Sequence, residues 1–540
     1  MRTFAVSFAF LLVAPLWAQV APEQFERIRQ EGLERSKVMA HLDHLVNRIG
    51  PRLTSSDNLT VACEWARDEF AAMGLADARL EQWGTMDVGF NRGPWWGRMV
   101  EPEQLELVCA TDAWSAGTRG PARGPVVRAP KDAVELAAMA PTLKGAWVLD
   151  VSRDMLTKVA DAIVEHGGHG MLASSGGDLV LTGGSERVHF DDLPKVPIVR
   201  IDKDGHDAIA DLVATDKPCV VEFDIRNHFK KGPIPVFNVI ADIVGSEKPD
   251  EFVVVGGHID SWDGASGTTD NGTGTATTME AARILIAIGA KPKRTIRFML
   301  WSGEEQGLLG SRAWVQAHKA ELAKYSACLV HDGGTNYVSG MAGMKEMQPQ
   351  LDSAFEHVLN LNAELPFKIR EIEAFTPIGS DHESFTAAGV PGFFWDQRGR
   401  ANYTFTHHTQ HDNYSAAIPE YQMHTAVVVA TGALGLANLP ALLTRENMKV
   451  QRGFGGGGQR NRRMLGVTLR DDGITIEEFG DESLAQKAGL LAGDTLVRIG
   501  DQAVASQDDL RKALAAGGPE KTVTVKRGDK EITVPIKFAR

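Results

Sequence analysis

The chain has 540 residues, of which 43% are hydrophobic and 24% charged, and its formal net charge is −13. This length is too great for one hydrophobic core and predicts two to four domains, while the composition is that of a globular protein. The acidic balance makes nucleic acid an improbable partner.

Residues 1–18, MRTFAVSFAFLLVAPLWA, have the pattern of a secretory signal peptide. One positive charge, Arg2, precedes an apolar run, and a small residue stands before Gln19 at a plausible cleavage point. The run is too short for a transmembrane anchor, and no other stretch is long and apolar enough to span a bilayer. The pattern predicts export, to a periplasm or to the medium.

Four cysteines, at positions 63, 109, 219 and 328, are few and far apart. A disulfide framework would be denser, although an exported protein could pair some of them. Each could equally be a small buried hydrophobe.

Residues 22–90 read as mainly helical, with one amphipathic segment ended by Gly50-Pro51 and a second, residues 59–74, ended by Gly74. Residues 110–232 differ, because short β-like runs and one helix near residues 155–167 alternate with Gly and Pro. We predict a small β-rich inserted domain over residues 110–232. It would divide a larger domain into residues 19–109 and 233–446.

From residue 236 the pattern becomes an alternation of strands and helices. Strands are predicted at 237–244, 251–257, 295–303, 326–332 and 389–397, with a helix through 279–289. Strands that alternate with helices indicate an α/β fold, in which a mostly parallel sheet is covered by helices on both faces.

Polar residues of only three types follow the ends of these strands. They are His258, Asp260 and Asp270; Glu304 and Glu305; Asp332; and His407, His408 and Asp412. In an open parallel sheet, ligands bind at the carboxyl ends of the strands. Crowded carboxylates raise one another's pKa unless a cation is bound, and imidazoles with carboxylates suit zinc or a similar divalent ion. Five candidate ligands suit two ions that share a bridging carboxylate, which leaves one of the paired glutamates free as a general base.

Five motifs carry a family resemblance: HIDSWDGASGTTDNGTG at 258–274, WSGEEQGLLGS at 301–311, HDGG at 331–334, GSDHESF at 379–385 and HHTQHD at 407–412. In this order they resemble the di-zinc aminopeptidases of metallopeptidase family 28. The resemblance covers about residues 35–100 and 234–440. It is strongest to the plasma glutamate carboxypeptidase-like branch, and the insert is similar to a protease-associated domain.

The resemblance implies five metal ligands. His258 and Asp332 would hold the first ion, Glu305 and His408 the second, and Asp270 would bridge them.

It also implies roles for residues around the ions. Glu304 would be the general base and then the acid, and Asp260 would orient His258. His407 stands where many relatives have a tyrosine that stabilises the oxyanion, so the same role is expected of this histidine. Asp381 and His382 are expected to line the substrate pocket.

The C-terminal part has a different pattern. Residues 447–463 contain a glycine-rich basic linker, and residues 464–540 contain short strands and one helix. LAQKAGLLAGDTLVRIGDQAV, at 484–504, resembles the core of PDZ domains, and the residues from Met464 to Val467 match their carboxylate-binding loop. The resemblance implies a PDZ-like β-barrel that binds peptide carboxyl ends.

Together these patterns predict an exported di-zinc exopeptidase that acts on peptides, with aminopeptidase, dipeptidase and carboxypeptidase activity left open. A binding protein on the same scaffold and a single-zinc acyltransferase similar to glutaminyl cyclases are the alternatives. The complete set of ligands and the Glu304-Glu305 pair favour hydrolysis.

Overall fold

The computed structural model describes residues 19–451 throughout. Beyond them it describes residues 465, 467–470, 474–479, 483–504, 509–510, 513–514, 520–528 and 530–537. The chain divides into two compact units, Met1–Phe454 and Gly455–Arg540. The predicted signal peptide, 1–18, and most of the predicted linker, 447–463, lie outside the described residues.

The first unit begins with helices. These are α1 (Pro22–Glu34), α2 (Val38–Asp43), the π-helical turn η1 (His44–Ile49) and α3 (Asp57–Met73). Helix α3 begins where the Ser56 hydroxyl accepts the N–H of Leu59, and it ends at Gly74, whose φ of 94° is left-handed. The prediction of mainly helical structure up to residue 90 extends too far, because residues 76–101 form a strand.

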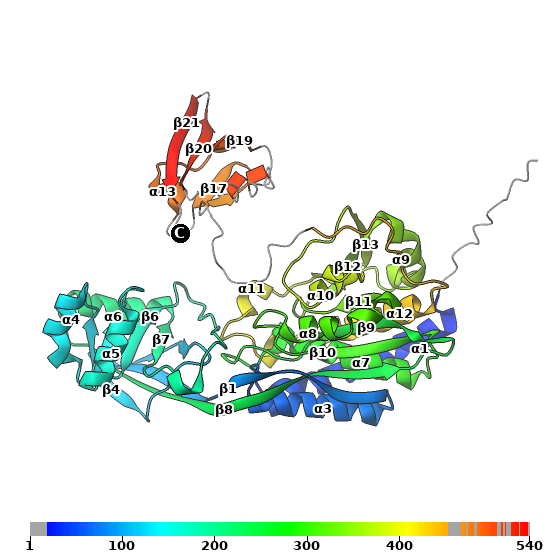
Figure 1. The fold of residues 1–540 in the computed structure, drawn as a ribbon, viewed down its shortest axis with the longest axis horizontal. Helices are drawn as coiled ribbons and strands as arrows, with labels where there is room; N and C mark the ends of the chain where they lie inside the picture. The colour runs from blue at the N-terminus through cyan, green and yellow to red at the C-terminus, as the bar shows by residue number, and fades with distance from the viewer. Residues whose placement is uncertain are drawn as a thin grey trace, which may run out of the picture. The chain divides into compact units, whose positions relative to one another are not determined.

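That strand, β1 (Ala76–Glu101), pairs antiparallel with β8 (Val220–Ile243) along its whole length. The two strands run from the main sheet into the inserted lobe (Figure 1). Both boundaries predicted for the insert, 109/110 and 232/233, fall inside strands, namely β3 and β8. Main and inserted parts are therefore joined by paired strands rather than by linkers.

The inserted lobe is itself built from alternating strands and helices. Its strands are β2 (Leu105–Leu107), β3 (Cys109–Thr111), β4 (Ala122–Arg128), β5 (Trp147–Leu149), β6 (Gly170–Ser174) and β7 (Ile198–Ile201). Its helices are α4 (Ala133–Met139), η2 (Ala140–Leu143), α5 (Leu156–His166), η3 (Phe190–Asp192) and α6 (Lys203–Ala214). Strands β4 to β7 are parallel, and Trp147 and Phe223 pack together in the buried core of the lobe.

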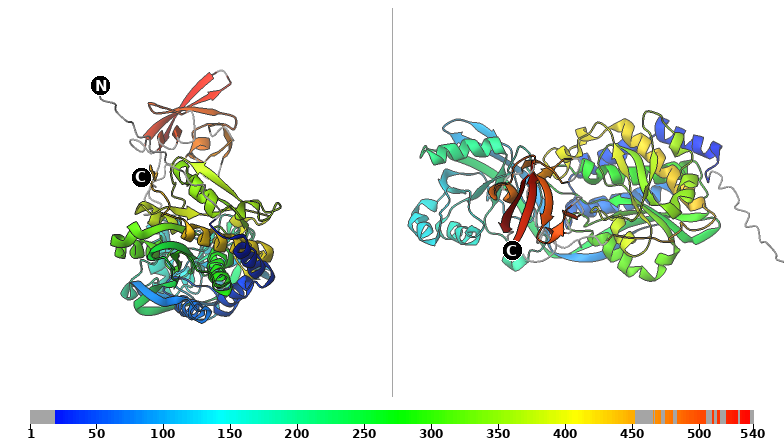
Figure 2. Two further views of the ribbon diagram at one scale, coloured as in Figure 1. Left: turned by 90° about the vertical axis from the view of Figure 1, so that its right-hand side faces the viewer. Right: turned by 90° about the horizontal axis from the view of Figure 1, so that it is seen from above.

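The main sheet has the strand order β14-β11-β9-β10-β8 and continues through β8 into the lobe. Strands β9 (Lys248–His258), β10 (Arg294–Trp301), β11 (Tyr325–Val330) and β14 (Gly392–Phe394) run parallel, whereas β8 is antiparallel to β10. Helices α7 (Thr273–Ala287) and α12 (Pro419–Asn438) cover one face with α3, and α8 (Leu309–Ala317) and α10 (His382–Ala387) cover the other (Figure 1, Figure 2). The predicted α/β class is confirmed.

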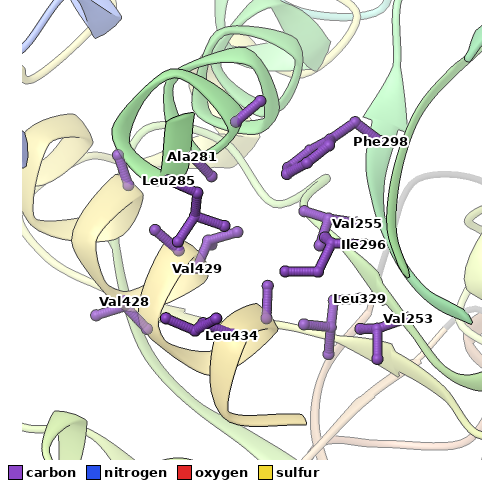
Figure 3. Close-up of a cluster of buried hydrophobic side chains, with 14 of the residues drawn as sticks. Val253, Val255, Ala281, Leu285, Ile296, Phe298, Leu329, Val428, Val429 and Leu434 are labelled. Carbon is purple, nitrogen blue, oxygen red and sulfur yellow. The ribbon is translucent and has the colours of Figure 1, made fainter. Parts of the chain in front are cut away.

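Alternation along β9 shows why both faces are buried. Val253 and Val255 belong to the core under α7 and α12, and Val254 belongs to the core under α8 and α10. In Figure 3, Val253, Val255 and Phe298 lie on the side of the strands, and Leu285 lies opposite them on the side of the helices. A strand that is buried on both faces requires a continuous apolar run, which is what residues 252–255 provide.

The remaining elements of the first unit lie around these layers. A small sheet has the order β13-β12-β15 and consists of β12 (Tyr337–Met344), β13 (Lys368–Ile372) and β15 (Asp396–Arg398). The short helices are η4 (Thr268–Gly272), η5 (Lys319–Lys324), η6 (Lys345–Met347), α9 (Gln348–Ala354), η7 (Val358–Asn360), α11 (Tyr403–Thr406) and η8 (Tyr414–Ala416).

The second unit has its own core, which includes Leu465, Leu490, Val523 and Val525. Its described elements are β16 (Val467–Leu469), β17 (Ile476–Phe479), α13 (Leu484–Lys487), β18 (Thr495–Ile499), β19 (Gln502–Ala503), β20 (Glu520–Arg527) and β21 (Lys530–Lys537). The β-rich character predicted for this part is confirmed.

All four cysteines are buried and free, so they act as small core residues in this structure. Within the described ranges, no helix combines the length and the apolarity needed to cross a bilayer.

Candidate metal centre

The predicted ligands converge where the parallel strands end. In the sheet β9 lies between β11 and β10, so His258 at the end of β9 neighbours the residues that follow those two strands. Asp332 follows β11, and Glu304 and Glu305 follow β10. Asp270 lies in η4, directly before α7. This is the edge where an open parallel sheet binds its ligands.

A first cluster forms around His258, which is fully buried. Its Nε2 atom lies 3.0 Å from Oδ1 of Asp332 and 3.2 Å from Oδ1 of Asp270. These three residues come from two strand ends and one turn, and their ligand atoms all lie within 4.8 Å of one another.

A second cluster forms around His408. Its Nε2 atom lies 3.0 Å from Oδ2 of Asp270 and 3.0 Å from Oε2 of Glu305. Asp270 thus turns one oxygen towards each cluster.

The two clusters fit a pair of divalent cations. Nitrogen and oxygen ligands bind zinc at about 2.0–2.2 Å, so neighbouring ligand atoms of a tetrahedral ion lie roughly 3.3 Å apart. The observed separations are close to this value. Oδ2 of Asp270 is buried and accepts no hydrogen bond, so its lone pairs are available to a cation.

Electrostatics point in the same direction. Burial, together with the neighbouring Asp270, raises the pKa of Glu305 to about 7. Burial also raises the pKa of Glu304 well above its usual range. Burial lowers the pKa of His408, but Glu305 and Asp270 outweigh it and raise the pKa to about 10. Without a bound cation, Glu304, Glu305 and His408 therefore bind protons more readily than they would in water.

Asp260 contacts more than the histidine that it was expected to orient. Its carboxylate accepts the backbone N–H groups of Glu304 and Glu305, both at 3.3 Å, and the hydroxyl of Thr54 at 3.1 Å. Nδ1 of His258 lies 3.0 Å from the main-chain oxygen of Asp260 and 3.6 Å from its carboxylate. Asp260 therefore fixes the turn that carries both glutamates.

Glu304 and His407 flank the two clusters. Oε2 of Glu304 lies 3.9 Å from Nε2 of His258. His407 stacks on His408 with 3.8 Å between ring centroids, and its Nε2 lies 3.6 Å from Oδ2 of Asp270. The side chain of His407 is 46% exposed, so it lies at the border between the centre and solvent.

Asp381 and His382, which were expected to line the substrate pocket, belong to the segment around the start of α10. Both are buried, and neither lines the cavity beside the clusters. That cavity is lined by Thr182, Trp262, Ala265, Gly267, Asp270, Glu305, His408, Thr409 and Asp412. Burial raises the pKa of Asp381 to about 7 and lowers that of His382 to about 4.

Several residues that hold the site together carried no signal in the sequence. Arg52 is fully buried and donates to the carbonyl oxygens of Ile259, Ser266 and Gly267 at 2.7, 2.9 and 2.8 Å. It therefore fixes the loop between β9 and η4. The sequence pattern around Arg52 does not reveal this role, because the partners of Arg52 are main-chain carbonyl groups far along the chain.

Two further carboxylates, those of Asp263 and Asp412, support the loop before α7. Arg92 forms a buried ion pair of 2.9 Å with Asp263. Asp412 accepts the backbone N–H groups of Thr269 and Asp270 at 2.6 and 3.1 Å. Both contacts fix the segment that presents Asp270.

Comparison with known proteins is consistent with this geometry. Residues 238–432 match the family model described as "Peptidase family M28", and residues 464–538 match the one described as "PDZ domain". Carboxypeptidase Q of Rattus norvegicus is 28% identical over 442 residues, which are 77% of this chain and 88% of that protein. Carboxypeptidase Q of Homo sapiens is 27% identical over 437 residues, with the same coverage.

A solved structure shares the fold. The crystal structure of a peptidase M28 precursor from Shewanella amazonensis is 25% identical, with a TM-score of 0.58. The match covers 78% of this chain and 98% of that one.

Proposed function

We propose that this chain, whose residues 238–432 match the model of peptidase family M28 and whose residues 464–538 match that of the PDZ domain, is an exported exopeptidase with two divalent cations in its site. One observation carries the proposal, namely the position of Asp270. Its two oxygens lie 3.2 Å from His258 and 3.0 Å from His408, as a bridging carboxylate requires. Zinc is the ion that best suits this set of imidazoles and carboxylates without thiolates.

Five residues would hold the ions. His258 and Asp332 would hold one ion, Glu305 and His408 would hold the other, and Asp270 would contribute one oxygen to each. When bound, the ions polarise a peptide carbonyl group and lower the pKa of water.

The other residues of the site would move protons and orient the peptide. Glu304 accepts a proton from the attacking water at its carboxylate and passes it to the leaving amine. Asp260 keeps Glu304 in place through the backbone N–H of that residue. His407 donates a hydrogen bond to the oxyanion, a role for which its partial exposure suits it.

The remaining parts of the chain fit an exported enzyme that acts on peptides. We propose that residues 1–18 direct export, that the insert is a protease-associated domain, and that residues 464–540 bind the carboxyl end of a peptide. Saturable binding of a peptide with a free carboxyl end by the full chain would support the last of these roles.

The decisive experiment compares wild type with Glu304→Gln in metal content and in cleavage of a peptide panel. The panel contains free dipeptides, peptides with blocked amino ends and longer peptides. We expect two ions in both proteins and a loss of cleavage of about 10²–10⁴-fold in the variant. Glu103→Gln, at an exposed position, is the matched control and should cleave as wild type does.

Each other outcome favours a named alternative. If the wild-type chain binds one ion and transfers an acyl group to the substrate's own amine, the result would favour a single-zinc acyltransferase similar to glutaminyl cyclases. Two ions without cleavage of any panel member would favour a binding protein. The panel also decides which end of the peptide the enzyme requires.

A further inference from the structure

A segment of the inserted lobe lies directly on the loop that carries His408. We call residues 178–184 the strap. The backbone N–H of Thr182 donates to the carbonyl oxygen of His408 at 2.7 Å, and the hydroxyl of Thr182 donates to the same oxygen at 3.1 Å. Leu181 and Thr409 form an antiparallel bridge beside this contact.

The strap is fastened at both ends. The side chain of Gln410 accepts the N–H of Val180 at 2.8 Å and donates to the carbonyl oxygen of Asp178 at 3.0 Å. At the other end the N–H of Ala113 donates to the carbonyl oxygen of Gly183 at 2.7 Å. The strap therefore connects the lobe to the histidine loop through a continuous set of hydrogen bonds.

His408 has a conformation that needs such support. Its φ is 57°, in the left-handed region that a residue with a Cβ atom adopts only when its surroundings hold it there. The carbonyl group of His408 is held by the strap, while its imidazole lies 3.0 Å from both Asp270 and Glu305. The backbone contact and the ligand geometry thus belong to one residue.

Packing beneath the strap is equally specific. A Cβ atom at Gly264 would lie 1.7 Å from Cγ2 of Thr182. Gly264 belongs to the loop between β9 and η4, so the absence of a side chain there lets Thr182 reach His408. Thr182 also lines the cavity that Trp262, Asp270 and Glu305 share.

We propose that Thr182 is a positioning residue of the metal centre, through which the inserted lobe holds His408 ready to bind the second cation. The inference rests on the proposed function. It gives the insert a direct part in building the site, in addition to any part in covering it. Loss of the strap contact should weaken one of the two metal sites and leave the other unchanged.

The test compares four full-length proteins: wild type, Gly264→Ala, the double variant Gly264→Ala/Thr182→Gly and Gly177→Ala. Gly264→Ala pushes Thr182 away, and removal of the Thr182 side chain in the double variant restores room for the strap backbone. Gly177 lies just before the strap, and a Cβ atom there meets nothing within 4 Å, which makes Gly177→Ala the matched control.

Two measurements are made on each protein. Hydrogen exchange of peptides that cover 178–184 and 405–411 is followed in metal-free protein, and zinc titration then gives the affinity of each site. We expect Gly264→Ala to exchange faster in both segments and to bind one of its two ions about 10–100-fold more weakly. The double variant should recover much of both properties, and Gly177→Ala should match wild type.

Unchanged exchange and two wild-type affinities in Gly264→Ala would overturn the inference. Equal weakening of both ions, or a double variant no better than Gly264→Ala, would also overturn it, because the effect would then be a general loss of structure. If wild type itself binds fewer than two ions, the proposed function fails, whereas the exchange data still report whether the strap holds the histidine loop.

Discussion

Asp260 and Asp270 are ten residues apart, the first in the loop after β9 and the second in η4. Their hydrogen-bond partners give the two carboxylates different roles. Asp270 keeps an oxygen that accepts no hydrogen bond and is available to a cation. Both oxygens of Asp260 are already occupied by backbone N–H groups. Residue type alone marks both as candidates, and the hydrogen-bond partners decide between ligand and support.

The first prediction concerns Asp260→Asn. An amide has one acceptor oxygen, so its NH₂ group must face one of the two N–H groups that the carboxylate now accepts. The turn with Glu304 and Glu305 should shift, and kcat should fall about 10–100-fold while two ions remain bound at saturating zinc. Steady-state kinetics with metal analysis measures both. Asp204→Asn, at an exposed position, is the control, and a kcat within twofold of wild type for Asp260→Asn would contradict the prediction.

The second prediction concerns Arg52→Met. The loop carbonyls that Arg52 now satisfies would be left buried without a donor, each at a cost of about 1–3 kcal/mol. We expect the free energy of unfolding of the metal-free first unit to fall by about 3 kcal/mol or more. Residues 455–540 contain no tryptophan, so urea unfolding followed by tryptophan fluorescence reports the first unit alone.

Arg48→Met is the matched control, because the side chain of Arg48 is 70% exposed. Its change in unfolding free energy should stay within about 0.5 kcal/mol. Equal stability of the two variants would show that the buried guanidinium contributes little.

Among the elements, α12 shows how a helix that is apolar all round is accommodated. Its residues from Thr425 to Ala437 are buried, and it packs against α7, α1 and α9. Close approach to α9 depends on a missing side chain, because a Cβ atom at Gly435 would lie 2.1 Å from the carbonyl oxygen of Ala354. A main-chain oxygen cannot move away by a change of rotamer, as a side-chain atom can.

The third prediction is that Gly435→Ala destabilises the first unit, by about 1–3 kcal/mol, although alanine is the better helix former. Gly32→Ala in α1 is the comparison. Its Cβ atom would meet Cγ2 of Val427 at 2.4 Å, which is a side-chain atom rather than main chain. Urea unfolding should therefore show a smaller loss for Gly32→Ala. The reverse order would mean that α9 shifts more readily than the valine.

Local pattern was sufficient for the elements of the main sheet. The runs at 251–257, 295–303 and 326–332 are apolar over the length of a strand, and they form β9, β10 and β11. Because parallel strands end at one edge, the order of these runs already brings His258, Glu305 and Asp332 to the same edge of the sheet.

Contacts between residues far apart in the sequence could not be predicted from the local pattern. Residues 76–90 read as helical, but they pair with β8 residues that lie between 139 (Phe90 with Phe229) and 166 (Ala76 with Asp242) positions later. Pairing between strands overrides local preference. The contact between Thr182 and His408 joins residues 226 positions apart. Nothing in either local sequence anticipates it, because its partners are a hydroxyl group and a main-chain carbonyl.

At the scale of the whole molecule, pH should change stability through buried histidines. His424 on α12 is 3% exposed, and burial lowers its pKa to about 4. Its Nε2 atom has no hydrogen-bond partner, and its ring contacts Tyr337 with 5.9 Å between centroids. The unfolded chain takes up a proton at this histidine near pH 6.5, whereas the folded chain does so only near pH 4. Between these values the unfolded state binds more protons, so lowering the pH favours unfolding.

The last prediction follows from that sign. As the pH falls from about 7 to about 4, His424 should remove about 3 kcal/mol of unfolding free energy, in addition to what other groups contribute. In His424→Gln this share disappears, so the difference in stability between wild type and variant should change by that amount over the same interval. Urea unfolding of both metal-free proteins at several pH values measures it. A difference that stays constant with pH would mean that His424 is protonated equally in the folded and unfolded states.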